Sequence, residues 1–467
     1  MSNQFKRRHF IKNAAALAAL VGLPVKKSFA NAEINDLLEA ASSTMPSAGQ
    51  PVFGLKVPPM KQVRVGIIGL GNRGSEHARL IDAIGLDKCK LVAICDIRPE
   101  VAGKVMDSLS KTGNQKPTVY MGTPTGWMEL CKRDDIDVVI IATQWEEHAP
   151  MAIYAMQQGK HVAVEVPAVL TIEECWKMVN TAEETQRNCM MLENVCYGDE
   201  ELWILNMVEK GVFGTLTYAE CAYIHDLREL LFSKTYYYKQ WRTHHIMERD
   251  GNLYPTHGLG PVAQYMGIDR GDRFDYLVSM SSLQAGMDEH SDTIEPDNDF
   301  YKKKGFKHGD INNTIIKTHK GRSILVQHDV VTGRPYNRIN MLAGTKAFHK
   351  GYPSKLAING QGHGFISDDD YKTYRKMHAH PLWAKLEKLA EKNGGHGGMD
   401  FVMLWRMIDC FNQGLPLDMD VYDAASWTVV TPLSELSVQL GSVPVRFPDF
   451  TKGAWKEERK LGVMVNS

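Results

Sequence analysis

The stretch Val63-Arg-Val-Gly-Ile-Ile-Gly69-Leu-Gly71-Asn72-Arg73-Gly74 decides the fold of this chain. An apolar run typical of a buried strand breaks into glycines and then into a helical pattern. In a dinucleotide-binding turn, Gly69 permits the tight turn, Gly71 lets the backbone approach a pyrophosphate, and Gly74 allows the helix to pack closely on the strand. The helix N-terminus would face the phosphates with unpaired N–H groups. The stretch therefore predicts a nucleotide-binding turn.

A second strand supports this interpretation. The apolar run Lys90-Leu-Val-Ala-Ile-Cys ends in Asp96, roughly 20 residues past the glycines, where such units place the acid that binds the ribose. An aspartate there, rather than an arginine, favours NAD over NADP. The alternative is a glycine turn and a surface aspartate with no nucleotide.

Length and charge limit the class of protein. At 467 residues the chain exceeds what one hydrophobic core usually supports, so we expect two domains. The 54 Lys and Arg against 55 Asp and Glu give a net charge of -1, which supplies no general field for nucleic acid or an anionic membrane. A chain with almost no net charge is better suited to binding small neutral ligands.

Residues 1–30 are predicted to be a twin-arginine signal peptide. Lys6-Arg-Arg precedes a short apolar stretch, Ala14 to Leu23, and a small-residue cleavage site, Ser28-Phe-Ala. That stretch is too short to span a bilayer and no later one is long enough, so we expect no membrane span and an extracytoplasmic, periplasmic protein. Export of a folded protein suits an enzyme that acquires its cofactor in the cytoplasm. The alternative is a basic N-terminus that stays attached.

The eight cysteines form no C-x-x-C pair and lie mostly within apolar runs. They are expected to be reduced thiols in the core, because a disulfide framework is improbable at this size. No residue pattern indicates a metal ligand. The cysteines are Cys89, Cys95, Cys131, Cys175, Cys189, Cys196, Cys221 and Cys410.

Four regions are expected along the chain. The signal at 1–30 is followed at 31–60 by a proline-containing arm or linker, and strands alternating with helices at 61–195 predict a Rossmann domain with a doubly wound parallel sheet. Residues 196–467, with β-rich runs such as Leu216–Ile224, predict an α+β domain with a large mixed or antiparallel sheet. Its free face would need a cover, so we expect a homodimer or larger homo-oligomer.

Polar residues follow three successive strands of the predicted parallel sheet. They are Thr143-Gln-Trp-Glu-Glu-His148, Glu165-Val166-Pro167 and Glu193-Asn194-Val-Cys-Tyr197. Because ligands of such sheets bind at the carboxyl ends of the strands, these groups are expected to meet in one crevice. For any single residue, and for His148 in particular, the alternative is a helix cap or turn.

The second region holds further candidates. In Tyr254-Pro255-Thr256-His257, Thr256 is expected to cap a helix that starts near residue 258, and His257 would lie in its first turn, where the helix end favours a neutral imidazole that can act as a base. A packed Tyr and His at a helix entry is the alternative. Arg242 lies close in sequence to this segment, Tyr336 on a turn after a strand is a weaker signal, and His396 lies in a glycine loop, Gly-Gly-His-Gly-Gly, that opens a helix.

These motifs together resemble the glucose–fructose oxidoreductase / inositol dehydrogenase family over nearly all of the chain from Lys61. Within it, the glycine turn, Glu165-Val-Pro, Tyr254-Pro-Thr-His and the His396 loop look most like the family 109 glycoside hydrolases, NAD-dependent α-N-acetylgalactosaminidases. Two departures favour this branch: Val166 stands where dehydrogenases usually carry a lysine, and the aspartate that often precedes the active-site histidine is missing. An ordinary alcohol dehydrogenation would lose its usual proton relay.

The resemblance implies a glycosidase that removes terminal α-linked N-acetylgalactosamine from a glycan without a pair of catalytic carboxylates. Hydride would pass from C3 of the sugar to tightly bound NAD, a base would remove the acidified C2 proton, and the aglycone would leave from C1. Water addition and return of the hydride would complete the turnover. Proton transfer is assigned to His257 and Tyr254, with Tyr197 as the C2 base.

Contacts to cofactor and sugar follow from position and resemblance. The residues expected to contact NAD are Gly69, Gly71, Asn72, Arg73, Gly74, Asp96, Trp145, Glu146, Glu147, His148, Glu165, Val166 and Asn194. The residues expected to contact the sugar are Arg242, Tyr254, Pro255, Thr256, His257, Tyr336 and His396.

Two rival functions share this fold. The main one is a net NAD-dependent oxidoreductase that acts on a sugar or cyclitol and releases a ketone, and the other is a non-enzymatic NAD-bound sugar-binding or structural protein. Val166 and the signal peptide favour hydrolysis over net oxidation. Either anomer, and either N-acetylgalactosamine or N-acetylglucosamine, is compatible with the motifs.

Overall fold

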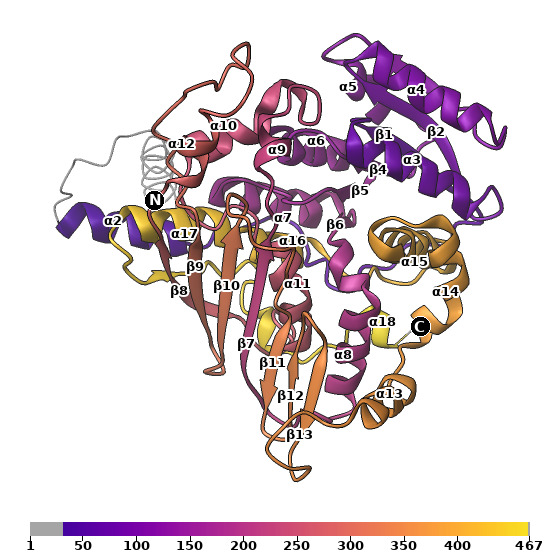
Figure 1. Cartoon of the computed structure of the whole chain (residues 1–467). Coiled ribbons are helices and arrows are strands. Elements are labelled where there is room, and N and C mark those ends of the chain that lie inside the picture. The colour runs from indigo at the N-terminus through magenta and orange to yellow at the C-terminus, as the bar shows by residue number, and fades with distance from the viewer. Residues whose placement is uncertain (1–30, 466–467) are drawn as a thin grey trace, which may run out of the picture.

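A computed structural model describes residues 31–465 of the chain, so the predicted signal peptide at 1–30 lies outside the described residues. The described part is built around two sheets, one of six strands and one of eight. The six-stranded sheet lies at the upper right of Figure 1, and the eight-stranded sheet lies below and to its left. The site described below lies between them.

The first sheet is parallel throughout and has the order β3-β2-β1-β4-β5-β6. This is the strand order of a dinucleotide-binding Rossmann fold, in which successive strands are added outward on one side of β1 and then, from β4 on, on its other side, and it confirms the predicted doubly wound sheet. The strands are β1 Val63–Ile68, β2 Cys89–Asp96, β3 Thr118–Met121, β4 Val138–Ile141, β5 His161–Val164 and β6 Cys189–Met191.

Helices cover both faces of this sheet because its central strands are buried on both sides. The helices are α3 Asn72–Ile84, α4 Pro99–Ser110, α5 Gly126–Cys131, α6 Trp145–Gln157 and α7 Ile172–Thr185. The sequence did not predict β3 or α5. The ends of β3 are exposed, so it lacks the apolar run that marks an inner strand. α6 begins at Trp145, three residues before His148, where the sequence pattern predicts its start.

The second sheet is mixed, as predicted, with the order β13-β12-β11-β7-β10-β9-β8-β14. Its central strands β7 and β10 are parallel to each other, and the other neighbouring pairs are antiparallel. The strands are β7 Leu216–Ile224, β8 Phe274–Ser281, β9 Asn312–Thr318, β10 Ser323–Asp329, β11 Met341–Gly344, β12 Ala347–Lys350, β13 Lys355–Ile358 and β14 Val445–Arg446.

Helices of the second region cover one face of this sheet, with α11 on β7 and α17 on β8. The helices and short 3₁₀ turns are η1 Asn194–Tyr197, α8 Asp199–Glu209, α9 Arg228–Phe232, η2 Tyr238–Gln240, α10 Trp241–Glu248, α11 Thr256–Tyr265, α12 Gly286–His290, α13 Asp368–Met377, α14 Pro381–Asn393, η3 His396–Gly398, α15 Met399–Gln413, α16 Val421–Thr428, α17 Val430–Gln439, η4 Ala454–Lys456 and α18 Gly462–Val465.

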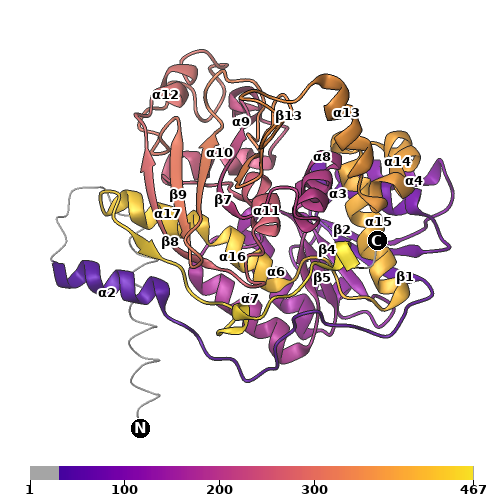
Figure 2. The same ribbon diagram turned by 90° about the horizontal axis from the view of Figure 1, so that it is seen from below.

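Helix α15 returns from the second region to the first sheet, where it packs against α3 and β1. Figure 2 shows α14 and α15 beside α3 and the strands of the first sheet. The late glycine loop before α15 is thereby brought next to the early glycine turn, although more than three hundred residues separate them in the sequence. The helix α15 thereby brings a loop from late in the sequence and a turn from early in the sequence into one site.

The arm at 31–60 lies along the body. Its helix, α2 Asn31–Ser42, contacts β14, and the extended part that follows is held by side chains of the C-terminal region. The ring of Phe53 stacks on that of Tyr422 at 3.9 Å, and the amide of Val52 donates to the Tyr422 hydroxyl at 3.2 Å. The arm therefore ties the N-terminal segment to the late helix α16.

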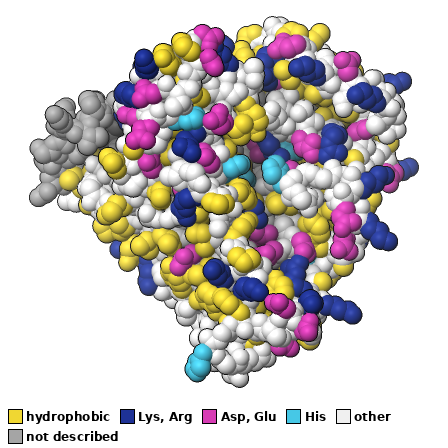
Figure 3. All heavy atoms as spheres, in the orientation of Figure 1, with side chains coloured by type: hydrophobic (Ala, Val, Ile, Leu, Met, Phe, Trp, Pro, Cys, Tyr) yellow, Lys and Arg dark blue, Asp and Glu magenta, His cyan; other side chains and the backbone are white. Residues whose placement is uncertain are grey.

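The outer face of the eight-stranded sheet carries apolar side chains that no described element covers. Met280 on β8 and Ile315 on β9 are more than half exposed. Figure 3 shows hydrophobic side chains gathered over this region at the lower left. No helix among residues 31–465 combines the length and the apolar character needed to cross a membrane.

All eight cysteines are buried and unpaired, which confirms the predicted reduced thiols. Burial raises the pKa of the Cys95 thiol to about 12, well above its ordinary value. These thiols are therefore apolar core groups rather than nucleophiles.

Candidate active site

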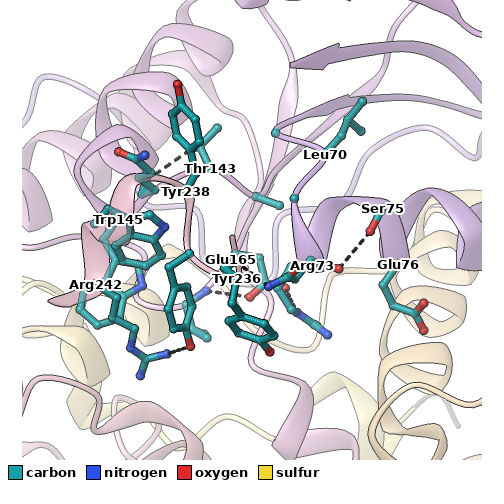
Figure 4. A pocket seen from close by; sticks show the side chains of 18 of the residues that line it. Leu70, Arg73, Ser75, Glu76, Thr143, Trp145, Glu165, Tyr236, Tyr238 and Arg242 are labelled. Carbon is teal, nitrogen blue, oxygen red and sulfur yellow. Dashed lines mark hydrogen bonds and ion pairs between the residues drawn. The ribbon is translucent and has the colours of Figure 1, made fainter. Parts of the chain in front are cut away.

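A cavity of about 1190 Å³ runs along the carboxyl ends of the first sheet and is closed on its other side by residues of the second region. Most of the predicted site residues meet there, and Figure 4 shows Arg73, Trp145, Glu165 and Arg242 among them. Those that line it are Gly69, Gly71, Asn72, Arg73, Asp96, Trp145, Glu147, His148, Glu165, Val166, Asn194, Arg242, Tyr254, His257, Tyr336 and His396. Those that do not are Gly74, Glu146, Pro255, Thr256 and Tyr197.

The three glycines of the turn have the geometry that the motif requires. A side chain on Gly69, which has a φ of +84°, would press on the carbonyl of Ala142 at 2.6 Å, and one on Gly74 would collide with the carbonyl of Gly69 at 1.8 Å. A side chain on Gly71 would instead point toward the cavity, where the closest atom, on Arg98, is 3.5 Å away. Backbone at Gly71 can thus approach a ligand at the N-terminus of α3.

Asp96, at the end of β2, is held rigidly beside the cavity. Its Oδ2 accepts the amide of Leu70 at 2.7 Å, and its Oδ1 accepts the amide of Arg98 at 2.9 Å. The guanidinium of Arg98 also pairs with this carboxylate, Nε to Oδ1, at 3.1 Å. The charge of Arg98 is thereby neutralised, so this end of the cavity suits the ribose hydroxyls of NAD better than a 2′-phosphate.

Arg73 joins three segments at the centre of the cavity. Its Nε donates to Glu165 at 2.8 Å, and its Nη1 donates to Asp400 at 2.8 Å. Asp400 also accepts from Asn194 at 2.6 Å, and Glu165 lies 2.7 Å from Nε2 of His77. Burial alone would raise the pKa of both carboxyls, but Arg73 and His77 at Glu165, and His396 and Arg73 at Asp400, hold each pKa well below its usual range. Arg73, predicted to contact NAD, thus also fixes the end of β5 and the start of α15.

The glycine loop before α15 is unusual in its backbone. Residues 394–398 all have positive φ, including His396 at +47°. Nδ1 of His396 lies 2.8 Å from Asp400, while the rest of its side chain, 60% exposed, reaches the cavity. The four glycines of the loop adopt positive φ without steric cost, and the loop places the side chain of His396 at the cavity.

The four residues from Trp145 to His148 have different roles. The Trp145 ring forms part of the cavity wall, and Glu147 also lines the cavity. The buried His148 lies 2.8 Å from the carbonyl of Pro167 and 3.2 Å from that of Thr143, so it joins the turns after β4 and β5. Glu146 turns away and lies 3.0 Å from His245.

Arg242 is a buried cation surrounded by aromatic rings. Its guanidinium lies 5.0 Å from the Trp145 ring and 4.7 Å from the Tyr254 ring, and its Nη1 donates to the Tyr237 hydroxyl at 3.1 Å (Figure 4). No carboxylate within residues 31–465 pairs with it, and its Nε has no hydrogen-bond partner there. Although burial disfavours the charged form, the surrounding tyrosines raise the pKa of Arg242, which stays cationic. An unpaired buried cation in a cavity is suited to a polar ligand.

His257 lies in the first turn of α11, as predicted, and is oriented by a residue that the sequence did not single out. Its Nδ1 lies 2.7 Å from Oε1 of the fully buried Glu193, just after β6. A carboxylate at this position accepts Nδ1–H and leaves Nε2, which has no protein partner among the described residues, for a ligand. The predicted cap is wrong: α11 already begins at Thr256, whose hydroxyl caps no helix and has no hydrogen-bond partner in the described part of the chain.

The remaining wall of the cavity is formed by tyrosines and a second histidine. The Tyr254 ring lies 4.9 Å from that of His257 and 4.8 Å from that of Tyr223. The Tyr223 hydroxyl lies 3.1 Å from Nδ1 of His225, which also lines the cavity beside Tyr336. Burial and the charge of Arg242 lower the pKa of His225, so its imidazole is neutral near neutral pH.

Two family models match the chain. The oxidoreductase family, NAD-binding Rossmann fold, matches residues 63–193, and the glycosyl hydrolase 109, C-terminal domain, matches residues 197–457. The chain belongs to glycosyl hydrolase family 109. With its NAD-binding domain, this family 109 chain is an NAD-dependent glycosidase.

Relatives of similar length support the family. The chain is 49% identical over 461 residues to a glycosyl hydrolase family 109 protein of Shewanella sp. (strain W3-18-1) and 48% identical over 461 residues to an alpha-N-acetylgalactosaminidase of Shewanella oneidensis. Each alignment covers 98% of both chains.

Solved structures with the same fold bind NADH. Levoglucosan dehydrogenase in complex with NADH has a TM-score of 0.62 and 18% identity, covering 83% of this chain and 100% of that one. An inositol dehydrogenase homolog from Azotobacter vinelandii, complexed with NADH and myo-inositol, has a TM-score of 0.60 and 18% identity, covering 84% and 99%. At these identities the likeness shows the fold alone.

In the family 109 chain, Tyr197 does not reach the cavity. Its side chain is buried, its hydroxyl donates to Asp418 at 3.2 Å, and burial beside that carboxylate raises its pKa well above the ordinary value. The physical reason is the 3₁₀ turn η1, which sends Asn194 toward Asp400 and turns Tyr197 toward Asp418. This placement argues against the predicted role of Tyr197 as the C2 base.

Proposed function

We propose that this family 109 chain removes terminal α-linked N-acetylgalactosamine from glycans, using NAD that stays bound through each turnover. The observation that carries the proposal is one cavity that joins an NAD cradle, Gly69 to Gly74 with Asp96, to an oriented histidine, His257. Support comes from the relative named as an alpha-N-acetylgalactosaminidase. Val166 favours transient over net oxidation, because an aliphatic side chain cannot relay the proton of a dehydrogenated alcohol.

The residues of the chain fit NAD. The side chain that Gly71 lacks would project into the cavity, the Asp96 carboxylate is held at its edge, and Oδ1 of the buried Asn194 has no partner among the described residues. When bound, NAD supplies a hydride acceptor and donor, so that C3 of the sugar is oxidised to a ketone and later restored. The chain itself must bind and orient the sugar and move protons.

His257 and Tyr254 move protons around C3 and the leaving group. Nε2 of His257 accepts the proton of the C3 hydroxyl as this carbon is oxidised, and Glu193 stabilises the imidazolium that results. The Tyr254 hydroxyl, which has no protein partner within residues 31–465, gives its proton to the leaving oxygen as the C1–O bond breaks and regains a proton from the water that adds at C1. Arg242, beside both rings, binds polar groups of the sugar.

We assign removal of the C2 proton to His225 rather than to Tyr197. A ketone at C3 acidifies C2–H, and the neutral imidazole of His225 accepts this proton while the C1–O bond to the aglycone breaks. The Tyr223 hydroxyl lies 3.1 Å from Nδ1 of His225, and by accepting Nδ1–H it would leave Nε2 unprotonated as the base. After water adds at C1, the same imidazole returns a proton to C2.

The first test needs no added cofactor. The purified protein is incubated with aryl α- and β-N-acetylgalactosaminides and N-acetylglucosaminides, and the protein is then denatured and its NAD(H) measured. We expect hydrolysis of the α-galactosaminide together with near-stoichiometric NAD(H). Accumulated NADH and a released ketone would favour the rival oxidoreductase, and activity in a preparation with no dinucleotide would contradict the proposal.

Export is also part of this proposal. A folded enzyme that carries its NAD through the twin-arginine pathway would not depend on free NAD in the periplasm. Replacing Arg7 and Arg8 together by lysine should leave the active protein in the cytoplasm, as measured by cell fractionation. Equal periplasmic activity in this variant would count against the route.

A second copy of the chain is the proposed cover for the open sheet face. Met280 on β8 and Ile315 on β9 are exposed on this face, and an uncovered apolar sheet face is typical of a subunit interface. Ile315→Glu should convert a dimer or larger oligomer into monomers, as measured by light scattering after size exclusion. A monomeric unmodified protein would contradict this arrangement.

A further inference from the structure

We propose that residues 233–240 form a strap that holds NAD in its cleft between turnovers. This strap is the loop between α9 and α10, and it contains three consecutive tyrosines, Tyr236, Tyr237 and Tyr238. The inference rests on the proposed function, because only an enzyme that regenerates its cofactor gains from never releasing it.

The strap belongs to the second region but touches the first domain at two separated points. The side-chain amide of Asn72, at the glycine turn, donates to the carbonyl of Tyr236 at 3.1 Å. The guanidinium of Arg98, beyond the end of β2, lies 4.9 Å from the centre of the Tyr238 ring. The strap thus crosses the cleft from the turn that faces the phosphates to the residue that pairs with Asp96.

The three tyrosines all line the cavity, and their contacts fall in different parts of it. Tyr238 lies at the ribose end through Arg98, Tyr236 lies at the glycine turn through Asn72, and Tyr237 lies at the sugar end through Arg242. Figure 4 shows Tyr236 beside Arg73 and Tyr238 beside Thr143, on different sides of the cavity. A run of adjacent rings therefore extends along the path of a bound dinucleotide.

The base of the strap is held by three buried hydrogen bonds, whereas its tip is held to the first domain by one hydrogen bond, from Asn72. The buried side chain of Gln240 donates to the carbonyl of Phe232 at 2.8 Å and to Asn298 at 3.1 Å, and Asn298 donates to the same carbonyl at 2.7 Å. These bonds close the loop where it leaves the second region. Tyr236 at the tip is 42% exposed.

A fixed base and a weakly held tip suit a segment that opens slowly to bind or release NAD. Within residues 31–465, one hydrogen bond and one cation–ring contact join the strap to the first domain, so the strap can lift to admit the dinucleotide as the protein folds. Once the rings close over a bound ligand, escape requires both contacts to break together. The tied base returns the strap to the same place after each opening.

The test measures release of NADH from the holoenzyme. NADH-loaded protein is mixed with a large excess of NAD, and the loss of the fluorescence of bound NADH gives the dissociation rate. Tyr238→Ala should release NADH about tenfold faster or more, whereas Tyr238→Phe, which keeps the ring over Arg98, should stay within about twofold of the unmodified protein. Tyr301→Ala, outside the cavity, is the matched control and should not change the rate.

A second variant tests the anchoring of the strap without touching its rings. Gln240 does not line the cavity, so Gln240→Ala should speed NADH release only if the tied base positions the strap. Circular dichroism confirms that each variant is folded. Unchanged release in folded Tyr238→Ala, or equal release from the Ala and Phe variants, would overturn the proposal.

The proposed function fails in a different way. Protein that binds NADH and shows strap-dependent release but hydrolyses no glycoside would contradict the glycosidase while supporting the strap. Protein that binds no NADH at all would overturn both. With the proposed function intact, Tyr238→Ala should also lose activity on dilution and recover it when NAD is added.

Discussion

Nδ1 of His257 lies 2.7 Å from Oε1 of Glu193, a carboxylate with no exposed surface. The two residues come from different domains, and their pairing fixes which nitrogen of the imidazole faces the substrate. The proposed chemistry depends on this orientation, because only Nε2 can take the proton of the sugar hydroxyl.

Glu193→Gln should lower kcat about 10- to 100-fold with little change in KM, because a charge-assisted hydrogen bond to the imidazolium is lost while the cavity lining stays the same. Steady-state kinetics on an aryl glycoside measures both constants. Glu209→Gln, on the exposed end of α8, is the control. An unchanged kcat would show that Glu193 does not assist proton transfer by His257.

Arg242→Met should separate function from stability. Loss of the cation should reduce kcat/KM about 10- to 100-fold, since hydrogen bonds to a charged group are lost. Its Tm should stay the same or rise, because a buried guanidinium without a carboxylate partner is costly to fold. Thermal denaturation and kinetics test this together. A lower Tm with intact activity would assign Arg242 a purely structural role.

Asp96→Ala should weaken NAD retention and leave the fold intact, because the carboxylate that is aimed at the ribose is lost. The expected cost is about 1.5–3 kcal/mol in binding free energy. Cofactor content after extensive dialysis gives the measure, with Asp369→Ala on exposed α13 as the control. If Asp96→Ala keeps its full cofactor content, the ribose assignment is wrong.

Asp269 should make stability depend on pH. Burial raises the pKa of its carboxyl to about 7, so the folded state binds this proton more tightly than the unfolded chain does. Stability from Asp269 is therefore fully present below about pH 4, is lost progressively as the pH rises from there to about 7, and stays lost at higher pH. Asp269→Asn should flatten this loss and gain on the order of 1–3 kcal/mol relative to the unmodified protein at high pH. Urea unfolding at several pH values measures it, and parallel curves would contradict the assignment.

Local signals in the sequence were sufficient for the cofactor half of the site. The glycine turn and Asp96 are defined by steric demands within one βα unit, and the structure places all of them as the motif requires. Val166 and Asn194 follow strands whose carboxyl ends must share an edge, so their place in the cavity followed from topology.

Contacts between residues far apart in the chain could not be predicted from the sequence. Glu193 was visible as a polar residue at a strand end, but its contact with His257 spans 64 residues and has no local pattern. Tyr197 was misplaced because a 3₁₀ turn, rather than an extended chain, follows β6. The strap was missed for a similar reason: three adjacent tyrosines in a loop carry no signal until the second region folds across the first domain.

The central claim is transient oxidation, in which C2 of the sugar loses and regains a proton in every turnover. Hydrolysis in heavy water followed by proton NMR of the released sugar tests it most directly, and His225→Asn should keep oxidation at C3 but lose exchange at C2. The account predicts deuterium at C2 of the product, with no net accumulation of NADH. A product that retains its C2 proton, released at a normal rate after NAD has been removed, would contradict it.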